Sequence, residues 1–156
     1  FGAWAMNGTA GNWIDTEDGN DKNDRAWHFV GTGDFNNDGN TDIIQRYHWN
    51  NSPGYIRIWL MNGNQRIGTV EVEAVDNNDW HIVGTGDFNQ DGNVDILWRN
   101  YTNGSNGVWM MRGTDVISKV DIAPMSDLNQ RIVGTGDFNN DGKSDIIWRN
   151  FADGQN

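Results

Sequence analysis

The nine residues DFNNDGNTD at Asp34–Asp42 recur twice in this chain, as DFNQDGNVD at Asp87–Asp95 and as DFNNDGKSD at Asp137–Asp145. All three copies read D-F-N-x-D-G-x-x-D. Oxygen-bearing side chains at positions 1, 3, 5 and 9, with a glycine at position 6 for a sharp reversal, suit a hard cation that takes six to eight oxygen ligands. The pattern therefore predicts one calcium loop per copy.

In each loop we expect side-chain oxygens from four positions and a backbone carbonyl from position 7. The predicted ligands are Asp34, Asn36, Asp38, Asn40 and Asp42; Asp87, Asn89, Asp91, Asn93 and Asp95; and Asp137, Asn139, Asp141, Lys143 and Asp145. The alternative is a metal-free hairpin turn, because Asn, Asp and Gly favour turns without any metal. A bare turn does not require three facing carboxylates that repel one another, so we favour three bound calcium ions per chain.

The pattern differs from an EF-hand, which needs a bidentate Glu at position 12 between two helices. Position 12 is Gln45, Trp98 or Trp148 in the three copies. The residues after each loop, such as Ile96-Leu97-Trp98, form short apolar runs that favour a strand. Each loop is therefore predicted to join two strands.

Composition limits the class of protein. A formal charge of -11 over 156 residues argues against nucleic-acid binding, and three divalent ions would reduce that charge to about -5. The chain has no Cys and no run of 18 apolar residues, so we expect neither disulfides nor a membrane span. Calcium would then stabilise the loops, and millimolar calcium is an extracellular condition, so we predict a secreted protein. Because the chain begins at Phe1 without a signal segment, we expect a processed or excised piece.

The repeat is longer than the loop. The first Asp of successive loops is separated by 53 and 50 residues, and a second motif recurs at Trp4–Gly8, Trp59–Gly63 and Trp109–Gly113. These spacings predict three repeat units, at roughly 1–53, 54–103 and 104–156. The two ends of the chain fall within a blade and not between blades. The middle copy predicts four antiparallel strands, at 80–86, 95–101, 107–111 and 116–122. Four strands in about 50 residues are typical of a β-propeller blade.

The predicted fold is thus all-β, a propeller of three four-stranded blades. Propellers have four to eight blades, so three are too few for a ring. We expect a homo-oligomer, a dimer of six blades, with an open filament as the alternative because the two ends differ. In the first unit we expect a third strand followed by a polar excursion at Gly11–Arg25, which is either a solvated acidic loop or a fourth cation site.

The segments around the loops resemble a known family. The run I-V-G-T-G-D-F-N-x-D-G-x-x-D-I, at Ile82–Ile96 and Ile132–Ile146 and with Phe29 leading the first copy, is similar to the FG-GAP or VCBS repeats of integrin-like propellers. The resemblance implies a structural calcium ion in the first hairpin of each blade. Relatives include integrin α-subunits, fungal lectins that bind sugars between blades, and accessory regions of secreted bacterial enzymes.

Aromatic, His and Arg residues are the candidates for ligand binding. The Trp at 4, 59 and 109 recurs, so we expect it to pack between blades. For the recurring Arg residues an ion pair with a loop Asp and a contact with sugar hydroxyls both stay open. His28 and His81 are either ligand contacts or ordinary edge residues. The candidate ligand residues are Trp27, His28, Arg46, Tyr47, His48, Trp80, His81, Arg99, Arg131 and Arg149.

Catalysis is the weaker prediction, because no Ser lies in a G-x-S-x-G elbow and the paired carboxylates belong to the predicted metal loops. We therefore expect a lectin-like protein that binds glycans and is not an enzyme. The alternatives are a structural or adhesive repeat that polymerises, and an accessory module of a secreted polysaccharide-degrading enzyme.

Overall fold

A computed structural model describes residues 2–7, 10–15, 26–48 and 53–153, with side chains described from residue 26 onward. These residues form twelve strands and no helix long and apolar enough to cross a bilayer. The strands are β1 (Gly2–Asn7), β2 (Ala10–Asp15), β3 (Trp27–Gly33), β4 (Asp42–Tyr47), β5 (Ile56–Asn62), β6 (Gln65–Val72), β7 (Trp80–Gly86), β8 (Asp95–Asn100), β9 (Asn106–Arg112), β10 (Asp115–Ile122), β11 (Gln130–Gly136) and β12 (Asp145–Asn150).

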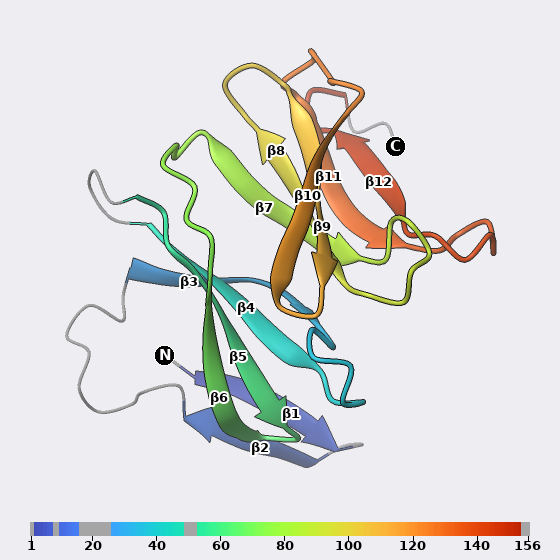
Figure 1. Cartoon of the computed structure of the whole chain (residues 1–156). Helices are drawn as coiled ribbons and strands as arrows, with labels where there is room; N and C mark the ends of the chain where they lie inside the picture. Colours follow the sequence, from blue (N-terminus) through green and yellow to red (C-terminus); the bar gives the residue numbers. More distant parts are fainter. Residues whose placement is uncertain (1, 8–9, 16–25, 49–52, 154–156) are drawn as a thin grey trace.

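The strands form two complete and two partial blades. Strands β3 to β6 and β7 to β10 each make a four-stranded antiparallel sheet in chain order, whereas β1–β2 and β11–β12 are separate two-stranded hairpins. Figure 1 shows β1–β2 and β11–β12 at opposite ends of the row of sheets. The predicted all-β, propeller-like arrangement of blades is confirmed, and the sheets are not closed into a ring. In the second sheet the observed strands agree with the predicted ones to within one residue.

The first segment differs from the prediction. Residues 10–15, expected to lie mostly in a polar excursion, form β2 and pair with β1 in a register that places Ala10 opposite Asn7. Backbone pairing with β1 satisfies the amides of this polar stretch, so polarity alone did not exclude a strand. Residues 16–25, which carry most of the acidic side chains of the predicted excursion, lie outside the described residues.

Neighbouring blades meet through their first strands. The Thr85 hydroxyl donates to the Thr32 carbonyl at 2.7 Å, and the Thr135 hydroxyl donates to the Thr85 carbonyl at 2.8 Å. A Cβ at Gly31 would lie 2.8 Å from Thr85 Cγ2, and a Cβ at Gly84 would lie 2.7 Å from Thr135 Cγ2. The Gly-Thr-Gly motif therefore allows β3, β7 and β11 to approach closely.

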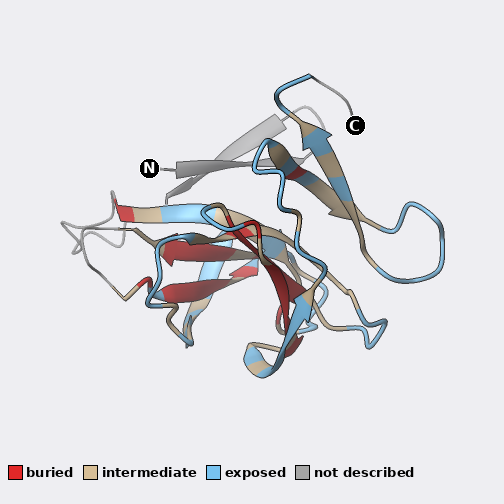
Figure 2. Ribbon diagram, turned by 90° about the horizontal axis from the view of Figure 1, so that it is seen from above, coloured by how far each residue is buried: buried red, intermediate tan, exposed pale blue. Residues whose placement is uncertain are grey.

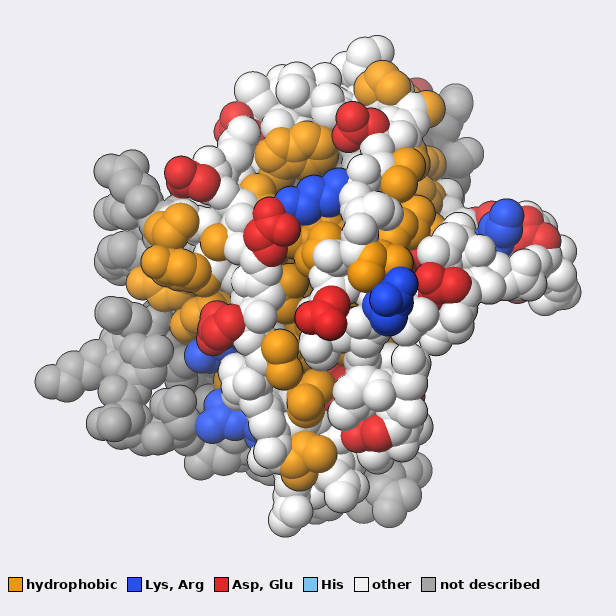
Figure 3. Space-filling model, viewed as in Figure 1, with side chains coloured by type: hydrophobic (Ala, Val, Ile, Leu, Met, Phe, Trp, Pro, Cys, Tyr) orange, Lys and Arg blue, Asp and Glu red, His pale blue; other side chains and the backbone are white. Residues whose placement is uncertain are grey.

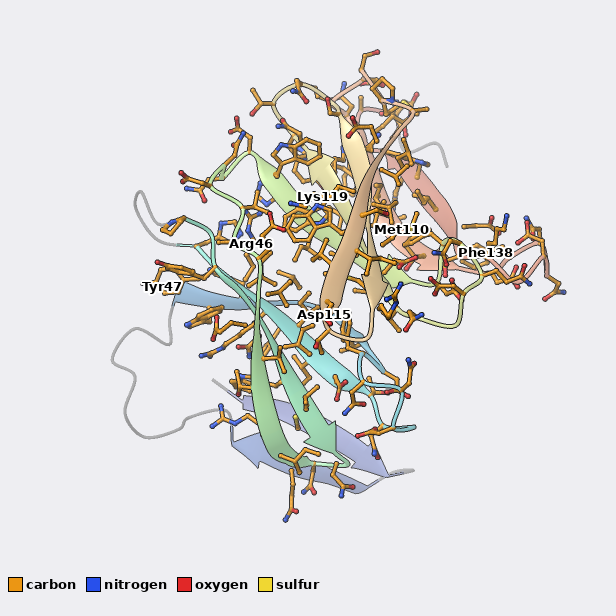
Figure 4. All side chains as sticks on the ribbon, viewed as in Figure 1. Arg46, Tyr47, Met110, Asp115, Lys119 and Phe138 are labelled. Atoms are coloured by element: carbon orange, nitrogen blue, oxygen red, sulfur yellow. The ribbon has the colours of Figure 1, made fainter. Side chains whose placement is uncertain are left out.

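Burial is concentrated in the two complete blades, as Figure 2 shows. Trp59 and Trp109, the third-strand tryptophans predicted to pack between blades, are buried. The third hairpin is different: Phe35 of the first loop is 1% exposed, whereas the matching Phe138 is 61% exposed and projects outward in Figure 4. The β11–β12 hairpin thus lacks the cover that a complete blade provides.

Candidate metal loops and ligand pocket

The three acidic loops share one backbone conformation. Each connects the first strand of a blade to the second, as predicted. The residue at position 4 has a positive φ in every loop, 57° at Asn37, 63° at Gln90 and 59° at Asn140. Position 6 has a φ of 82° to 86° at Gly39, Gly92 and Gly142, a range that glycine adopts without strain. The loops therefore turn sharply at two points.

The first Asp of each loop accepts hydrogen bonds from the backbone of its own loop. In the first copy, Asp34 accepts from the N–H groups of Asp38 at 3.0 Å and Gly39 at 2.8 Å. Asp87 accepts from the corresponding two amides at 3.2 and 2.8 Å, and Asp137 does so at 3.1 and 3.0 Å. The fifth-position Asp accepts from the amide of position 7 in all three copies.

The last Asp links its loop to the third strand of the blade. Asp95 is buried, and its two oxygens accept from Phe88 N–H at 3.0 Å and Met111 N–H at 2.9 Å. Asp42 is also buried and accepts from Phe35 N–H at 3.0 Å and from Met61 N–H at 2.9 Å. This carboxylate therefore has a structural role whether or not it also binds a cation.

The loop carboxylates interact electrostatically. Burial raises the pKa of Asp95, and the negative charges of Asp91 and Asp87 raise that pKa further. Burial raises the pKa of Asp42, with a further contribution from Asp38. Hydrogen bonds, the largest from Asn93, lower the pKa of Asp91. The three carboxylates of the middle loop are thus close enough to repel one another, and a divalent cation would relieve this repulsion.

The residues present fit a hard cation. Among residues 26–48 and 53–153, no three acidic, His or Cys side chains are already gathered as a metal-binding cluster. The first Asp of the first two loops accepts a hydrogen bond from Gly39 N–H or Gly92 N–H. A carboxylate oxygen has a second lone pair after accepting one N–H, so each loop keeps several oxygen donors. The donor set consists of carboxylate, amide and carbonyl oxygens, which calcium prefers. The assignment of these loop residues as calcium ligands therefore remains a prediction.

Comparison with models of protein families shows which family the chain is related to. The model of the FG-GAP-like repeat matches residues 34–98 and 87–148. The chain belongs to the FG-GAP-like repeat family. Each matched segment begins at the first Asp of one loop and extends past the next loop, so the matches coincide with the repeat described above. No curated protein and no solved structure matches the chain.

One FG-GAP-like repeat contains a hollow of about 180 Å³ on the face of the β7–β10 sheet, next to Val75 of the preceding linker. Its lining includes Trp80, Trp98, Trp109 and Lys119. The Trp98 and Trp109 rings lie 4.8 Å apart at 44°, and Lys119 Nζ lies 4.4 Å from the centre of the Trp109 ring. Hydrophobic side chains gather down the middle of the face in Figure 3, where Figure 4 places Lys119.

Trp98, one of the residues that line the hollow, has a donor without a partner. Trp98 is 2% exposed, and its Nε1 atom has no hydrogen-bond partner in the structure. A buried N–H without a partner costs about 1–3 kcal/mol.

The first FG-GAP-like repeat fills the same space with an arginine. Sheet register places Gln45 opposite Arg57, and the equivalent pair in the second repeat is Trp98 opposite Gly107. The Arg57 guanidinium lies 4.0 Å from the centre of the Trp27 ring, and its Nε donates to Gln45 Oε1 at 2.6 Å. Gly107 leaves this volume open. Comparing the copies at this position would have indicated the pocket from the sequence.

Five side chains form a row across three repeats at one end of the first strands. The ring centres of His28 and His48 are 5.7 Å apart, those of His48 and His81 are 5.6 Å apart, and those of His81 and Tyr101 are 5.2 Å apart. The Arg131 guanidinium carbon lies 4.3 Å from the Tyr101 ring centre. Four of these five are predicted ligand residues, and Tyr101 is not among those predicted. The row does not line the hollow, whereas Trp80 does.

The remaining predicted ligand residues lie elsewhere. Trp27 and Tyr47 contact each other edge to face, with ring centres 5.3 Å apart. Arg149 is exposed on β12, and its guanidinium carbon lies 5.6 Å from the Phe151 ring centre. Neither group belongs to the hollow.

Arg46 and Arg99 correct the prediction of ligand contact. Both are fully buried. Arg46 donates to the Asn77 carbonyl at 3.1 Å and to the Trp80 carbonyl, and Arg99 donates to the Met125 carbonyl at 3.3 Å. Burial lowers the pKa of Arg46 to about 10. These guanidinium groups hold the linker that follows each complete sheet, and no donor of theirs faces solvent.

The row of rings gives a prediction on pH. Burial, followed by the charges of Arg46, His81 and His28, lowers the pKa of His48 to about 4 from an ordinary value of 6.5. The unfolded chain therefore binds this proton before the folded chain does, and stability falls as the pH drops from about 6.5 towards 4. We expect a loss of about 1–2 kcal/mol after allowing for partial exposure of the ring.

Melting curves of the wild type and of His48→Tyr between pH 7.5 and 4.5 would measure this loss. The variant reproduces the second repeat, where Tyr101 occupies the matching position. His48→Tyr should lose less stability on acidification than the wild type. Equal losses in both proteins would contradict the assignment.

Proposed function

We propose that this FG-GAP-like repeat protein is a calcium-stabilised, extracellular β-propeller module that binds carbohydrate and is not an enzyme. The observation that carries the proposal is the hollow of about 180 Å³ that Trp80, Trp98 and Trp109 line. Its lining is mainly apolar, with Lys119 and Asp121 as polar groups.

This chemistry suits a sugar ring. Aromatic faces pack against the C–H face of a pyranose, and a few polar groups orient its hydroxyls. Lys119 lies over Trp109 and also pairs with Glu73, so its ammonium group is near both the aromatic surface and the rim. Asp121 supplies an acceptor. Donor and acceptor beside aromatic rings support a neutral polyhydroxyl ligand.

The calcium and extracellular parts of the proposal rest on the loops. Three loops of one conformation each carry three carboxylates, which oppose folding unless a cation neutralises them. Calcium sites of modest affinity are filled where calcium is millimolar, outside the cell. Without Cys, the chain has no disulfide to take over this stabilising role.

A substitution in the hollow tests the ligand. Gly107→Arg copies Arg57 of the first repeat and should fill the space, lowering affinity for a bound glycan at least tenfold. Gly107→Ala is the matched control, because a Cβ there would meet Val120 O at 3.4 Å and Asp121 Oδ1 at 3.8 Å, which are tolerable contacts. A glycan array with the wild-type protein would identify the ligand, and titration with both variants would locate it.

The outcomes separate the candidate functions. Binding retained by Gly107→Ala and lost by Gly107→Arg supports a lectin or an accessory module of a polysaccharide-degrading enzyme. Equal binding by all three proteins would place the sugar outside the hollow. A wild-type protein that binds no glycan would favour the structural or adhesive repeat, which the exposed apolar side chains of β11–β12 also support.

A further inference from the structure

Each acidic loop contacts the loop of the next repeat. Figure 1 shows the three loops on the same side of the row of sheets. The Asn37 side chain donates from Nδ2 to Asn93 Oδ1 at 3.1 Å, which joins the first loop to the second. The Ser144 N–H donates to the Asp87 carbonyl at 2.7 Å, which joins the second loop to the third. The loops therefore form a continuous chain of contacts.

Position 4 of a loop makes a contact at both junctions. This position has a positive φ, 57° at Asn37 and 63° at Gln90. Asn37 bonds to position 7 of the second loop, as described above. Gln90 lies against position 6 of the third loop, where a Cβ on Gly142 would overlap the Gln90 side-chain amide. The same loop position thus contacts the following loop in both cases, although the residue differs.

Position 8 of a loop packs against the end of the strand before the preceding loop. A Cβ at Gly33 would lie 2.6 Å from Val94 Cγ1, and a Cβ at Gly86 would overlap the Ser144 side chain. Position 8 directly precedes the last Asp of its loop, which is a predicted calcium ligand. A movement of this Asp would therefore move a residue that touches the neighbouring repeat.

The contacts join predicted ligands of different ions. Asp87 is the first ligand position of the second loop, and its carbonyl accepts the N–H of the residue before Asp145, the last ligand position of the third loop. Asn93 is expected to bind calcium through its backbone carbonyl, and its side chain accepts from Asn37 and from Gly113 N–H, both at 3.1 Å. An ion in one loop would thus order residues that the next loop contacts.

We propose that the three loops bind calcium cooperatively, with the side chains of Asn37 and Gln90 coupling neighbouring loops. The inference rests on the proposed function, since it requires that the loops bind calcium. Binding that orders one loop reduces the entropy cost of ordering the next, which gives positive cooperativity. Repulsion between the ions opposes this effect, but each ion faces three carboxylates, and exposed charges are screened over about 8 Å at physiological ionic strength.

Native mass spectrometry at sub-saturating calcium tests the coupling, because it counts the chains that carry no, one, two or three ions. With three equal and independent sites at half-saturation, about three quarters of the chains carry one or two ions. A coupling of about fivefold at each junction, the lower end of typical values, reduces that share to about one half. We expect a share of about one half or less in the wild type.

Variants at position 4 locate the coupling. Glycine tolerates the positive φ and removes the side chain, so the double variant Asn37→Gly/Gln90→Gly should raise the share of chains with one or two ions. Asn140→Gly is the matched control, because Asn140 has the same loop position and a φ of 59°. Its side chain makes no hydrogen bond among the described residues. The control should give the wild-type distribution.

The outcomes separate this inference from the proposed function. A wild-type chain that binds three ions with the distribution of independent sites would overturn the coupling and leave the calcium sites standing. A double variant that matches Asn140→Gly would overturn the role of Asn37 and Gln90. A chain that binds no calcium would overturn both the coupling and the calcium part of the proposed function.

Discussion

Excess EDTA should lower the melting temperature of the protein by roughly 15–30 °C. A ligand that binds only the folded state adds about 2.7 kcal/mol per site when its free concentration is a hundredfold above Kd. The chain has three equivalent loops, and in a protein of this size 1 kcal/mol corresponds to about 2–4 °C. Removing calcium also leaves the repelling carboxylates of each loop unneutralised. Calorimetry in millimolar calcium and in EDTA measures the difference.

Adding back a metal provides the control for this experiment. Excess calcium should restore the melting temperature, and magnesium should restore less of it, because magnesium demands a small octahedral site and gives up its water reluctantly. A melting temperature that does not change in EDTA would mean that the loops are ordinary turns.

Substituting Asp95 by Ala should destabilise the protein by about 3 kcal/mol even when EDTA is present. The reason is that Asp95 is fully buried and satisfies two backbone amides, those of Phe88 and Met111. Both amides would be left without an acceptor. Denaturant unfolding of the wild type and the variant, each in EDTA, gives the free-energy difference.

Asp91→Ala is the matched comparison from the same loop. Asp91 is exposed, and the groups that hydrogen-bond to it belong to the loop itself. Its substitution should therefore be costly in calcium and nearly neutral in EDTA. If both variants lost their effect in EDTA, the structural role of Asp95 would be wrong; if Asp91→Ala had no effect in calcium, its role as a ligand would be wrong.

The sequence was sufficient for the parts of the fold that each repeat builds in the same way. Three copies of one loop, each followed by a short apolar run such as Ile96-Leu97-Trp98, indicated hairpins rather than helices, and the structure places β7 and β8 on either side of the middle loop. Local patterns of this kind depend on backbone preferences and on alternation of side chains, which the sequence states directly.

Features that depend on neighbouring elements were harder to predict. The buried Arg99 was assigned to a ligand or an ion pair, yet it binds backbone carbonyls of a linker some 26 residues along the chain. The hollow depends on the absence of a side chain at Gly107, which a search for binding residues does not notice. The low burial of Phe138 reflects the two-stranded sheet to which its loop belongs, since Phe35, in the matching loop of a four-stranded sheet, is buried.

The central claim is that each repeated loop binds one calcium ion, and native mass spectrometry of the protein in the presence of calcium tests it most directly. We expect a mass increase of three calcium ions per chain, reduced to two in Asp91→Ala. A wild-type chain that carries no calcium, at concentrations of the ion that saturate known extracellular sites, would contradict this account.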